Sequence, residues 1–365
     1  MMRRILILYL GANSGHHTAA RAIEEAMHRR NPGIQTACMD LLAHSHPRWN
    51  VLVTRTYLGM IRRTPELWDA LYDSRGIDAI TRRIQRLVQM GNNPRFLNLM
   101  ESFAPDAVVC TQAYPFAVVG AYARRRRAGF PIWGVITDYR PHRFWVNDFD
   151  CRYAAPNDAA AERLSHMGVP EKNIRIFGIP IRQDFADAPP ASRPAGAIPR
   201  LLITGGGRGL GPGAGALRAL DRGRSAFRIT MMTGMNHAMQ RRLADQRKTF
   251  NHALRIVPYT RNMASFMRRS SLLIGKPGGL TCAESMALGL PMLIVRPLPG
   301  QERGNAEELV RHGAAIRVRK DRELPAISDL LLGHPELLRL MSAQALSIGR
   351  PHAAMDIARE VMNEP

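Results

Sequence analysis

Short apolar runs recur along the whole chain and alternate with longer segments of mixed polarity. Runs of this length suit strands that are buried on both faces, and the segments between them are long enough for helices. The alternation predicts an α/β fold with two doubly wound parallel sheets that carry helices on both sides. The predicted strands are residues 5–10, 107–110, 132–136, 201–203, 228–232, 272–274 and 292–295.

The chain is long enough for two domains, and its composition changes near the middle. Its 365 residues, 45% of them hydrophobic, exceed the usual size of one domain and can fill two cores. Residues 186–199 are rich in proline and alanine and lack apolar periodicity, which is typical of an exposed linker. We therefore expect an N-terminal domain over residues 1–185 and a C-terminal domain over residues 200–346, with a cleft between them.

The start of the chain has only part of the pattern of a secretion signal. Its apolar core is short and is followed by Asn13, Ser14 and a histidine pair in place of a cleavage site, so a buried strand is the better interpretation. No run of about 18 apolar residues occurs. Any membrane contact is therefore expected to be peripheral.

A large positive charge indicates a polyanionic partner. The chain has 51 Lys and Arg against 30 Asp and Glu, a net charge of +21, and arginine supplies nearly all of the cations. Such a field attracts nucleic acid or the anionic face of a membrane. Genome composition can explain arginine in place of lysine, but it does not explain the net excess.

Cysteine spacing argues against two further classes of site. The four cysteines are far apart and form no C-x-x-C pair, so we expect neither a zinc site nor a disulfide framework. This spacing fits the reducing cytoplasm.

A glycine pair marks the first candidate site. Gly278 and Gly279 follow a predicted strand and let the backbone approach a ligand before a helix that we expect to start at Thr281. Free N–H groups and the helix dipole would stabilise a phosphate there, and Lys276 adds a point charge. An alternative needs no ligand, since Thr281 and Glu284 have the spacing of a capping box.

Polar groups follow the next predicted strand, residues 292–295. Gln301, Glu302 and Asn305 supply two amides and a carboxylate beyond its end. Because ligands bind at the carboxyl ends of strands in open α/β sheets, these side chains are candidates for the same site.

A second glycine loop, Gly205-Gly206-Gly207, follows the first predicted strand of the C-terminal domain. It continues into a formal G-x-G-x-x-A match, but a dinucleotide site also needs an acidic residue after the next strand, where this chain has none. Lys276 is followed by Pro277 and lacks the upstream glycine of a Walker loop. These patterns argue against NAD and against a P-loop.

Two side chains are candidates for accepting a proton. His16 lies in a glycine-containing turn after the first predicted strand, where a helix terminus would lower its pKa and keep it neutral near pH 7. Asp138 follows another predicted strand and can face a cleft from its carboxyl end. The structural alternatives are an exposed or capping histidine and an aspartate that caps a turn, and His17 is an adjacent competitor. The sequence does not rank His16 against Asp138.

Residues 57–100 interleave arginines with apolar residues. Ile80, Ile84 and Leu87 share one face of a predicted helix with arginines elsewhere, a pattern typical of an interfacial helix. An ordinary amphipathic helix packed on its own domain has the same pattern. Four arginines at 124–127 are a second candidate membrane contact or a solvated helix end.

Four ordered segments resemble one group of glycosyltransferases. They are LGANSGHHTAARAI, GVITDYRPHRFWVNDFDCRYAAPND, FGIPIRQDF followed by LLITGGGRGLGP, and GKPGGLTCAESMALGLPMLIVRPLPGQERGNA. Together they are similar to the GT-B glycosyltransferases that include monogalactosyldiacylglycerol synthases, bacterial processive diacylglycerol glucosyltransferases and, more distantly, the peptidoglycan enzyme MurG. The resemblance covers most of the chain.

The resemblance implies the GT-B fold, two Rossmann-like domains facing a central cleft, with residues 347–365 returning as a helix to the N-terminal domain. It implies an inverting transfer of hexose from UDP-glucose or UDP-galactose to diacylglycerol, with His16 or Asp138 as the base. The implied partners are the UDP-sugar, the lipid and an anionic membrane surface, with no specific nucleic acid. The implied location is peripheral, on the cytoplasmic face of the membrane.

The donor site follows from the same resemblance. Glu284 would hold the ribose hydroxyls, while Gln301, Glu302 and Asn305 would contact the sugar. No cofactor and no metal is required in principle, because backbone dipoles and cations can stabilise the leaving diphosphate. The implied donor-binding residues are Gly205, Gly206, Gly207, Arg182, Lys276, Gly278, Gly279, Glu284, Gln301, Glu302 and Asn305.

Departures from the family patterns leave the sugar open. Asn13 and Ser14 stand where the galactolipid synthases carry more glycine, and Glu302 differs from the second glutamine of MurG. The KPGG and PGQE elements look closer to the processive diacylglycerol glucosyltransferases. Glucose or galactose, and one sugar or several, remain alternatives.

Three other hypotheses compete with a diacylglycerol glycosyltransferase. A GT-B sugar-nucleotide epimerase needs no lipid acceptor and hence no basic amphipathic segment, and a glycosyltransferase could also use a different lipid. A nucleic-acid-binding surface predicts steeply salt-dependent DNA affinity but leaves both glycine loops unexplained.

Overall fold

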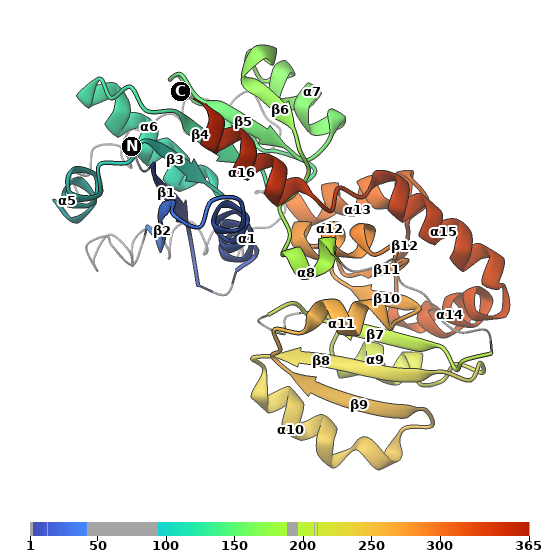
Figure 1. Ribbon diagram of the computed structural model, residues 1–365. Helices are drawn as coiled ribbons and strands as arrows, with labels where there is room; N and C mark the ends of the chain where they lie inside the picture. Colours follow the sequence, from blue (N-terminus) through green and yellow to red (C-terminus); the bar gives the residue numbers. More distant parts are fainter. Residues whose placement is uncertain are drawn as a thin grey trace. The chain divides into compact units, whose positions relative to one another are not determined.

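The computed structural model describes residues 3–12, 14–41, 94–187, 196–207, 209 and 211–364. Within these ranges the chain forms two compact units, each built on a parallel sheet of six strands (Figure 1). The first unit comprises Met1–Gln183, Pro299–Gln301 and His352–Pro365, and the second comprises Asp184–Leu298 and Glu302–Pro351. The predicted α/β fold with two doubly wound sheets is confirmed.

The N-terminal sheet has the strand order β2-β1-β3-β4-β5-β6. Because β2 and β3 lie on opposite sides of β1, the winding of the chain reverses between β1 and β3, and ligands bind at such reversal points. The strands are β1 (Arg4–Tyr9), β2 (Gln35–Asp40), β3 (Ala107–Cys110), β4 (Ile132–Val135), β5 (Arg152–Ala155) and β6 (Ile174–Ile176).

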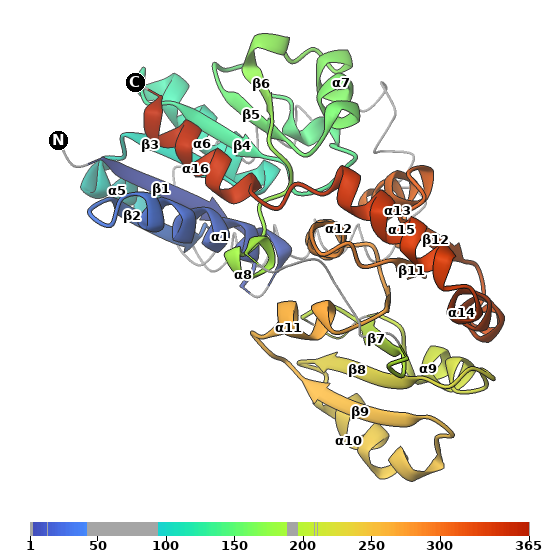
Figure 2. The same ribbon diagram turned by 45° about the vertical axis from the view of Figure 1, so that its right-hand side comes forward.

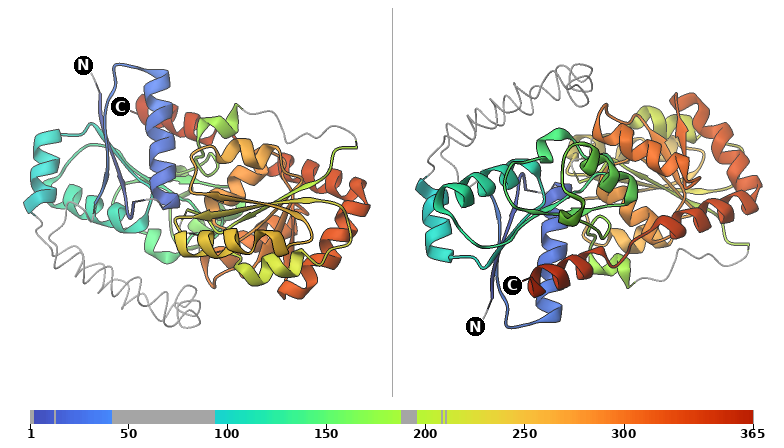
Figure 3. Two further views of the ribbon diagram at one scale, coloured as in Figure 1. Left: turned by 90° about the horizontal axis from the view of Figure 1, so that it is seen from below. Right: turned by 90° about the horizontal axis from the view of Figure 1, so that it is seen from above.

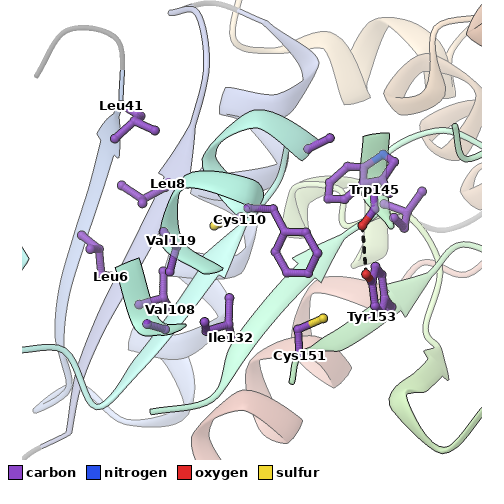
Figure 4. Close-up of a cluster of buried hydrophobic side chains, with 14 of the residues drawn as sticks. Leu6, Leu8, Leu41, Val108, Cys110, Val119, Ile132, Trp145, Cys151 and Tyr153 are labelled. Atoms are coloured by element: carbon purple, nitrogen blue, oxygen red, sulfur yellow. Dashed lines mark hydrogen bonds between the residues drawn. The ribbon is translucent and has the colours of Figure 1, made fainter. Parts of the chain in front are cut away.

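Both faces of this sheet are covered. On one face Leu6, Val108 and Tyr153 pack with side chains of α5 and α6, and the Tyr153 hydroxyl donates a hydrogen bond to Trp145 O at 2.9 Å (Figure 4). The helices of this unit are α1 (Gly15–Arg30), α5 (Pro94–Phe103), α6 (Ala113–Arg126), α7 (Asp158–His166) and α16 (Ala353–Asn363), with short 3₁₀ turns η2 (Arg143–Trp145) and η3 (Glu171–Asn173). The short helix α8 (Gln183–Ala186) lies at the boundary, and from Asp184 on its residues group with the second unit.

The last helix, α16, completes the other face. Ile357 and Val361 are fully buried in the same cluster as Ile23 of α1 and Trp133 of β4, and α16 lies beside α1 (Figure 2). The Trp133 indole N–H donates to Glu364 Oε2 at 2.5 Å. The end of the chain is therefore part of the N-terminal core.

The C-terminal sheet has the order β12-β11-β10-β7-β8-β9, so its winding reverses between β7 and β10. Leu201, Leu272 and Leu293 point to one core, and the alternate residues Leu202 and Leu273 are buried as well. Helices lie on both sides of the strands (Figure 3). The strands are β7 (Arg200–Thr204), β8 (Arg228–Gly234), β9 (Ala253–Pro258), β10 (Leu272–Gly275), β11 (Met292–Val295) and β12 (Ala315–Val318).

The remaining helices belong to this second unit, apart from the first residue of α13, which groups with the first unit. They are α9 (Ala214–Leu220), α10 (His237–Asp245), α11 (Met263–Arg268), α12 (Gly279–Ala287), α13 (Gln301–Arg311), α14 (Leu324–Gly333) and α15 (Pro335–Ile348), with 3₁₀ turns η4 (Arg247–Thr249) and η5 (Asp321–Glu323). Among the described helices of both units, none is long and apolar enough to cross a membrane.

The predicted strands all form, and four of the five strands that the pattern missed have a common cause. β2, β6, β9 and β12 are the outer strands of the two sheets as described, and their exposed or half-buried residues interrupt the apolar run. The exception is β5, which is internal and begins with Arg152.

Two predicted segments fall largely outside the described residues. They are the interfacial segment 57–100 and the linker 186–199. The arginine run 124–127 is described: Arg124 pairs with Asp148 at 2.6 Å and Arg126 with Glu101 at 3.3 Å, at the exposed end of α6.

Candidate active site

His16 lies at the carboxyl ends of β1 and β3, where the N-terminal sheet reverses. Helix α1 begins at Gly15, and the side chain of its N-cap, Ser14, accepts a hydrogen bond from His17 N. Gly11 has φ of 77°, and its N–H donates to Asp40 Oδ2 at 3.0 Å, which fixes the turn before the helix. The turn thus directs His16 towards the end of β3.

Two threonines hold the His16 ring from the ends of neighbouring strands. Thr111 O lies 2.9 Å from His16 Nδ1, and the Thr137 hydroxyl lies 3.0 Å from the same nitrogen. A carbonyl oxygen only accepts hydrogen bonds, so Nδ1 carries the hydrogen and Nε2 keeps the lone pair. The Thr111 hydroxyl also donates to His16 O at 2.9 Å. The ring is oriented so that Nε2 can accept a proton.

Burial keeps this histidine neutral. Loss of hydration lowers the pKa of His16, and the hydrogen bond to Thr111 opposes that shift only partly. The predicted direction is confirmed, but the main cause is burial and not the helix terminus. A neutral imidazole near pH 7 is the form that acts as a base.

A second histidine, His142, lies in the electrostatic field of the first. Burial is the main cause that lowers the pKa of His142 to about 3, and the charges of His16, when it is protonated, and of Arg163 add to the shift. Its ring packs edge-on against Phe144 and lies 6.3 Å from the Trp145 ring. His142 is therefore a neutral, buried neighbour of the candidate base.

The two alternatives to His16 have different surroundings. Asp138 immediately follows Thr137 and is partly buried. His17 stacks on Tyr9 with ring centroids 4.5 Å apart, and its pKa is lowered by burial and by Arg21. Asp138 thus stays at the same sheet edge as His16, while the His17 ring is engaged with β1.

In the C-terminal unit the two glycine turns start from neighbouring strands. Thr204 of β7 is the register partner of Gly275 of β10, so the turns after these residues begin side by side. This position is the reversal point of the sheet, the counterpart of the His16 position in the first unit.

The first glycine loop is packed backbone against backbone. A Cβ atom on Gly205 would lie 2.6 Å from Gly211 N, and one on Gly209 would lie 2.2 Å from Thr233 O. Gly206 has φ of 70°, and a Cβ there would meet no atom of the residues that the structure describes within 4 Å. Packing therefore explains Gly205, whereas Gly206 leaves room for a ligand. Gly207 O accepts Met235 N at 3.0 Å, which joins the loop to the next turn.

The second turn leads into α12, which begins two residues earlier than predicted. The N-cap is Gly278, and the first helical bond runs from Cys282 N to Gly278 O at 2.9 Å. Thr281 is consequently inside the first turn, so the capping-box interpretation of Glu284 is wrong. No side chain caps the helix, and its first turn contains no acidic residue. The first backbone N–H groups of α12, including that of Gly279, have no acceptor within the helix, so they suit an anion.

The polar residues after β11 fasten the second turn. Lys276 Nζ lies 3.2 Å from Glu302 Oε1, and Leu298 N donates to Glu302 Oε2 at 2.7 Å. Asn305 is fully buried and donates to Pro277 O at 3.0 Å. In this structure Asn305 holds the turn and is not exposed to a sugar, and Lys276 is paired with a carboxylate.

The remaining predicted donor residues are less tightly placed. Glu284 is partly buried in the second turn of α12, and Gln301 opens α13. Arg182 belongs to the first unit, whose first segment ends at Gln183, and it lies just before α8. The structure thus brings Gly206, Gly278 and Lys276 to one sheet edge, while Arg182 belongs to the other unit.

Three residues of the N-terminal site were not predicted. Thr111 acts through its carbonyl group, which any residue would provide, so no sequence pattern marks it. Thr137 was noticed only as the neighbour of Asp138. His142 lies in a polar segment, and only the fold shows that it is buried.

Family comparisons agree with the division into two units. Residues 16–181 match the monogalactosyldiacylglycerol (MGDG) synthase model, and residues 213–346 match the glycosyltransferase family 28 C-terminal domain. A processive diacylglycerol beta-glucosyltransferase of Bacillus cytotoxicus is 28% identical over 373 residues, which cover 99% of this chain and 94% of the relative.

Solved structures show the same fold at low sequence identity. MurG of Acinetobacter baumannii superposes with a TM-score of 0.62 at 17% identity, covering 99% of this chain and all of MurG. UDP-GlcNAc 2-epimerase of Neisseria meningitidis, bound to UDP-GlcNAc, has a TM-score of 0.61 at 14% identity, with 99% and 100% coverage. The near-equal scores mean that the fold alone does not separate transferase from epimerase.

Proposed function

We propose, since the chain belongs to the family of monogalactosyldiacylglycerol synthases and processive diacylglycerol glucosyltransferases, that it transfers a hexose from a UDP-sugar to diacylglycerol. The family membership supports a diacylglycerol glycosyltransferase that makes glycolipid. UDP as the carrier, glucose or galactose as the sugar, and inversion of configuration are the further parts of the proposal. We place the reaction on the cytoplasmic face of an anionic membrane, with the protein bound peripherally.

The observation that carries the donor half is the pair of glycine turns at the reversal point of the C-terminal sheet. The diphosphate would lie on the open side of Gly206 and on the uncapped start of α12 at Gly278. Lys276 keeps donor hydrogens beyond its bond to Glu302 and can add positive charge. Glu284 is proposed to bind the ribose hydroxyls.

Contacts to the sugar and the remaining charge complete the donor half. Gln301 and Glu302, at the start of α13, are proposed to contact the sugar, and Arg182 is a further cation for the diphosphate. Asn305 would act indirectly, by holding the turn at Pro277. Fixed dipoles and cations would stabilise the leaving UDP, so no metal is required in principle.

In the acceptor half, His16 is proposed as the base. Its Nε2 would take the proton of the diacylglycerol hydroxyl as that oxygen attacks the anomeric carbon and the bond from this carbon to the diphosphate oxygen breaks. Attack from the side opposite the leaving group inverts the configuration. Asp138, at the same sheet edge, is the alternative base.

The test is a product analysis with the purified full chain. Diacylglycerol in anionic vesicles is incubated separately with UDP-glucose and UDP-galactose, and the lipids are identified by mass spectrometry. A hexosyl diacylglycerol that is absent with the His16→Ala variant is the expected result. UDP release without glycolipid would mean that the acceptor is wrong.

The same assay tests the epimerase alternative. Conversion of UDP-GlcNAc to an isomer without any acceptor would favour that activity and contradict the transfer reaction. Failure to consume any of the three nucleotide sugars would contradict the proposed donor class.

A further inference from the structure

Glu302 joins the second glycine turn to the segment that follows β11. Its Oε1 lies 3.2 Å from Lys276 Nζ, and its Oε2 accepts a hydrogen bond from Leu298 N at 2.7 Å. The side chains of Lys276 and Glu302 are only 16% and 21% exposed, so solvent ions screen their attraction weakly. Glu302 therefore neutralises much of the positive charge that Lys276 brings to the turn.

The fold holds Glu302 in this position. It lies in the first turn of α13, and three residues further along the same helix the buried Asn305 donates to Pro277 O at 3.0 Å. Residues three apart share one face of a helix, so both contacts fasten that face of α13 to the turn between β10 and α12. An anion bound at this turn thus has a fixed carboxylate as well as an ammonium group for a neighbour.

A fixed carboxylate distinguishes the two nucleotides of the proposed reaction. In a UDP-sugar the terminal phosphate is esterified to the hexose, whose hydroxyl groups donate hydrogen bonds to a carboxylate. In UDP a free phosphate oxygen takes the place of the hexose, and it titrates with a pKa of about 6, so it is charged at neutral pH. A carboxylate attracts the hydroxyl groups and repels the charged oxygen.

We propose that Glu302 makes the donor site select the UDP-sugar over UDP. Its carboxylate oxygens accept hydrogen bonds from the hexose, while its negative charge offsets Lys276 and opposes the free terminal phosphate. UDP is the product of the transfer, so the same carboxylate promotes its release. This inference rests on the proposed function, in which the diphosphate lies at Gly278 and the hexose lies at Glu302.

The alternative is a purely structural role, since Glu302 also holds the segment before α13 through Leu298 N. Glutamine keeps that bond, because its amide oxygen is an acceptor, but it carries no charge. Glu302→Gln therefore removes the charge beside Lys276 and retains the support of the segment. Glu307→Gln is the matched control, because it removes the charge of an exposed carboxylate that pairs with Arg303 on the same helix.

The test is a comparison of nucleotide affinities. Isothermal titration calorimetry of the full chain measures the Kd of UDP, UDP-glucose and UDP-galactose without lipid. Glu302→Gln should bind UDP at least about tenfold more tightly than the unmodified protein, because one negative charge beside the diphosphate is gone. Its affinity for the UDP-sugars should change by less than about threefold, because the stronger bond to the diphosphate is offset by a weaker bond to the hexose.

Two controls locate the effect at the terminal phosphate. Glu307→Gln should have the same affinities as the unmodified protein. UMP lacks the terminal phosphate, so Glu302→Gln should change its Kd by less than about threefold. An equal gain in affinity for UMP and UDP would mean a general effect of net charge and would overturn the proposal.

Other results of the titrations would also overturn it. Unchanged UDP affinity in Glu302→Gln together with weaker binding of the UDP-sugars would reduce Glu302 to a sugar contact. Unchanged affinity for all of these nucleotides would reduce it to a structural residue. Neither result contradicts the proposed transfer reaction.

Product inhibition links the selection to turnover. In the glycolipid assay, UDP should inhibit Glu302→Gln at about one-tenth of the concentration that inhibits the unmodified protein, and an equal inhibition constant would contradict the role in product release. Because the titrations need no acceptor, their outcome stands whether or not glycolipid forms. Binding of none of these nucleotides to the unmodified protein would contradict the proposed donor class, and this inference with it.

Discussion

The two sheets carry their candidate sites at equivalent positions, but one site consists of side chains and the other of backbone. At the reversal point of the N-terminal sheet, a side chain is aimed: His16 is held by Thr111 and Thr137 from neighbouring strand ends. At the reversal point of the C-terminal sheet, the backbone itself forms the site, through the loop at Gly206 and the start of α12. One fold thus fixes an imidazole ring at the sheet edge of one unit and presents backbone turns at the equivalent edge of the other.

The largest effect should come from removing the aimed side chain. His16→Ala is expected to lower kcat by a factor of about 10² to 10⁴, the usual contribution of a general base, while the KM for the UDP-sugar changes little. His17→Ala is the matched control, since His17 stacks on Tyr9, and it should retain most of the activity. Steady-state kinetics of UDP release measure both. Comparable losses of kcat in the two variants would contradict a specific role of His16.

Substitutions in the backbone site should change the free energy of unfolding. Gly209→Ala places a Cβ atom 2.2 Å from Thr233 O at a residue with φ of 64°, so the free energy of unfolding should fall by about 3 kcal/mol. Gly213→Ala, where nothing lies within 4 Å, should lower it by no more than about 1 kcal/mol. Urea denaturation compares them. A small effect at Gly209 would mean that the loop does not depend on close backbone packing.

Acid should destabilise the folded protein through the two histidines of the N-terminal site, His142 and His16. The pKa of His142 is about 3 in the folded protein, so between pH 6.5 and that value the unfolded chain binds more protons. The free energy of unfolding therefore falls as the pH decreases, by about 2 kcal/mol between pH 6.5 and 5 from this group alone. The lowered pKa of His16 acts in the same direction. Denaturation of His142→Asn across this range should show a shallower pH dependence, and an unchanged slope would contradict the assignment.

A smaller effect should follow from loosening the second glycine turn. Asn305→Ala removes the hydrogen bond to Pro277 O, and we expect the free energy of unfolding to fall by about 1–3 kcal/mol and the KM for the UDP-sugar to rise. Glu307→Ala on the same helix, which removes an exposed ion pair with Arg303, is the control and should change stability by less than about 1 kcal/mol. A raised KM in the control as well would argue against a specific role of Asn305.

The mildest change tests how His16 is held. Thr137→Val removes one hydroxyl beside Nδ1 but leaves Thr111 O, so kcat should fall by no more than about tenfold, and Thr137→Ser should restore it. The pH profile of kcat/KM should shift in the valine variant alone, because the environment of the base has changed. An unchanged profile together with lower stability would indicate a purely structural role.

The sequence predicts the fold further than it predicts the sites, and the residues show why. Strands such as β3 and β11 are buried on both faces, so their apolar runs mark them at the predicted bounds. Outer strands such as β9 are half exposed, and their pattern is mixed. Burial on two faces leaves a local pattern, whereas burial on one face depends on partners distant in the chain.

The candidate sites show the same limit at the level of single residues. His16 could be selected because a histidine after a glycine turn is chemically distinctive. Its orientation depends on Thr111, which lies 95 residues away and acts through its backbone. Asn305 has the residue type of a sugar contact, but the fold buries it completely against Pro277. Residue type marks candidates, and long-range packing decides which of them face a ligand.

The position of α16 has a consequence for how the protein is made on the ribosome. The second unit ends at Pro351, so its entire sequence is synthesised before α16 appears. The first unit, in contrast, lacks Ile357 and Val361 of its core until residues 353–363 have been synthesised. The second unit can therefore reach its final packing first, and the first unit, most of which is synthesised earlier, must wait for α16.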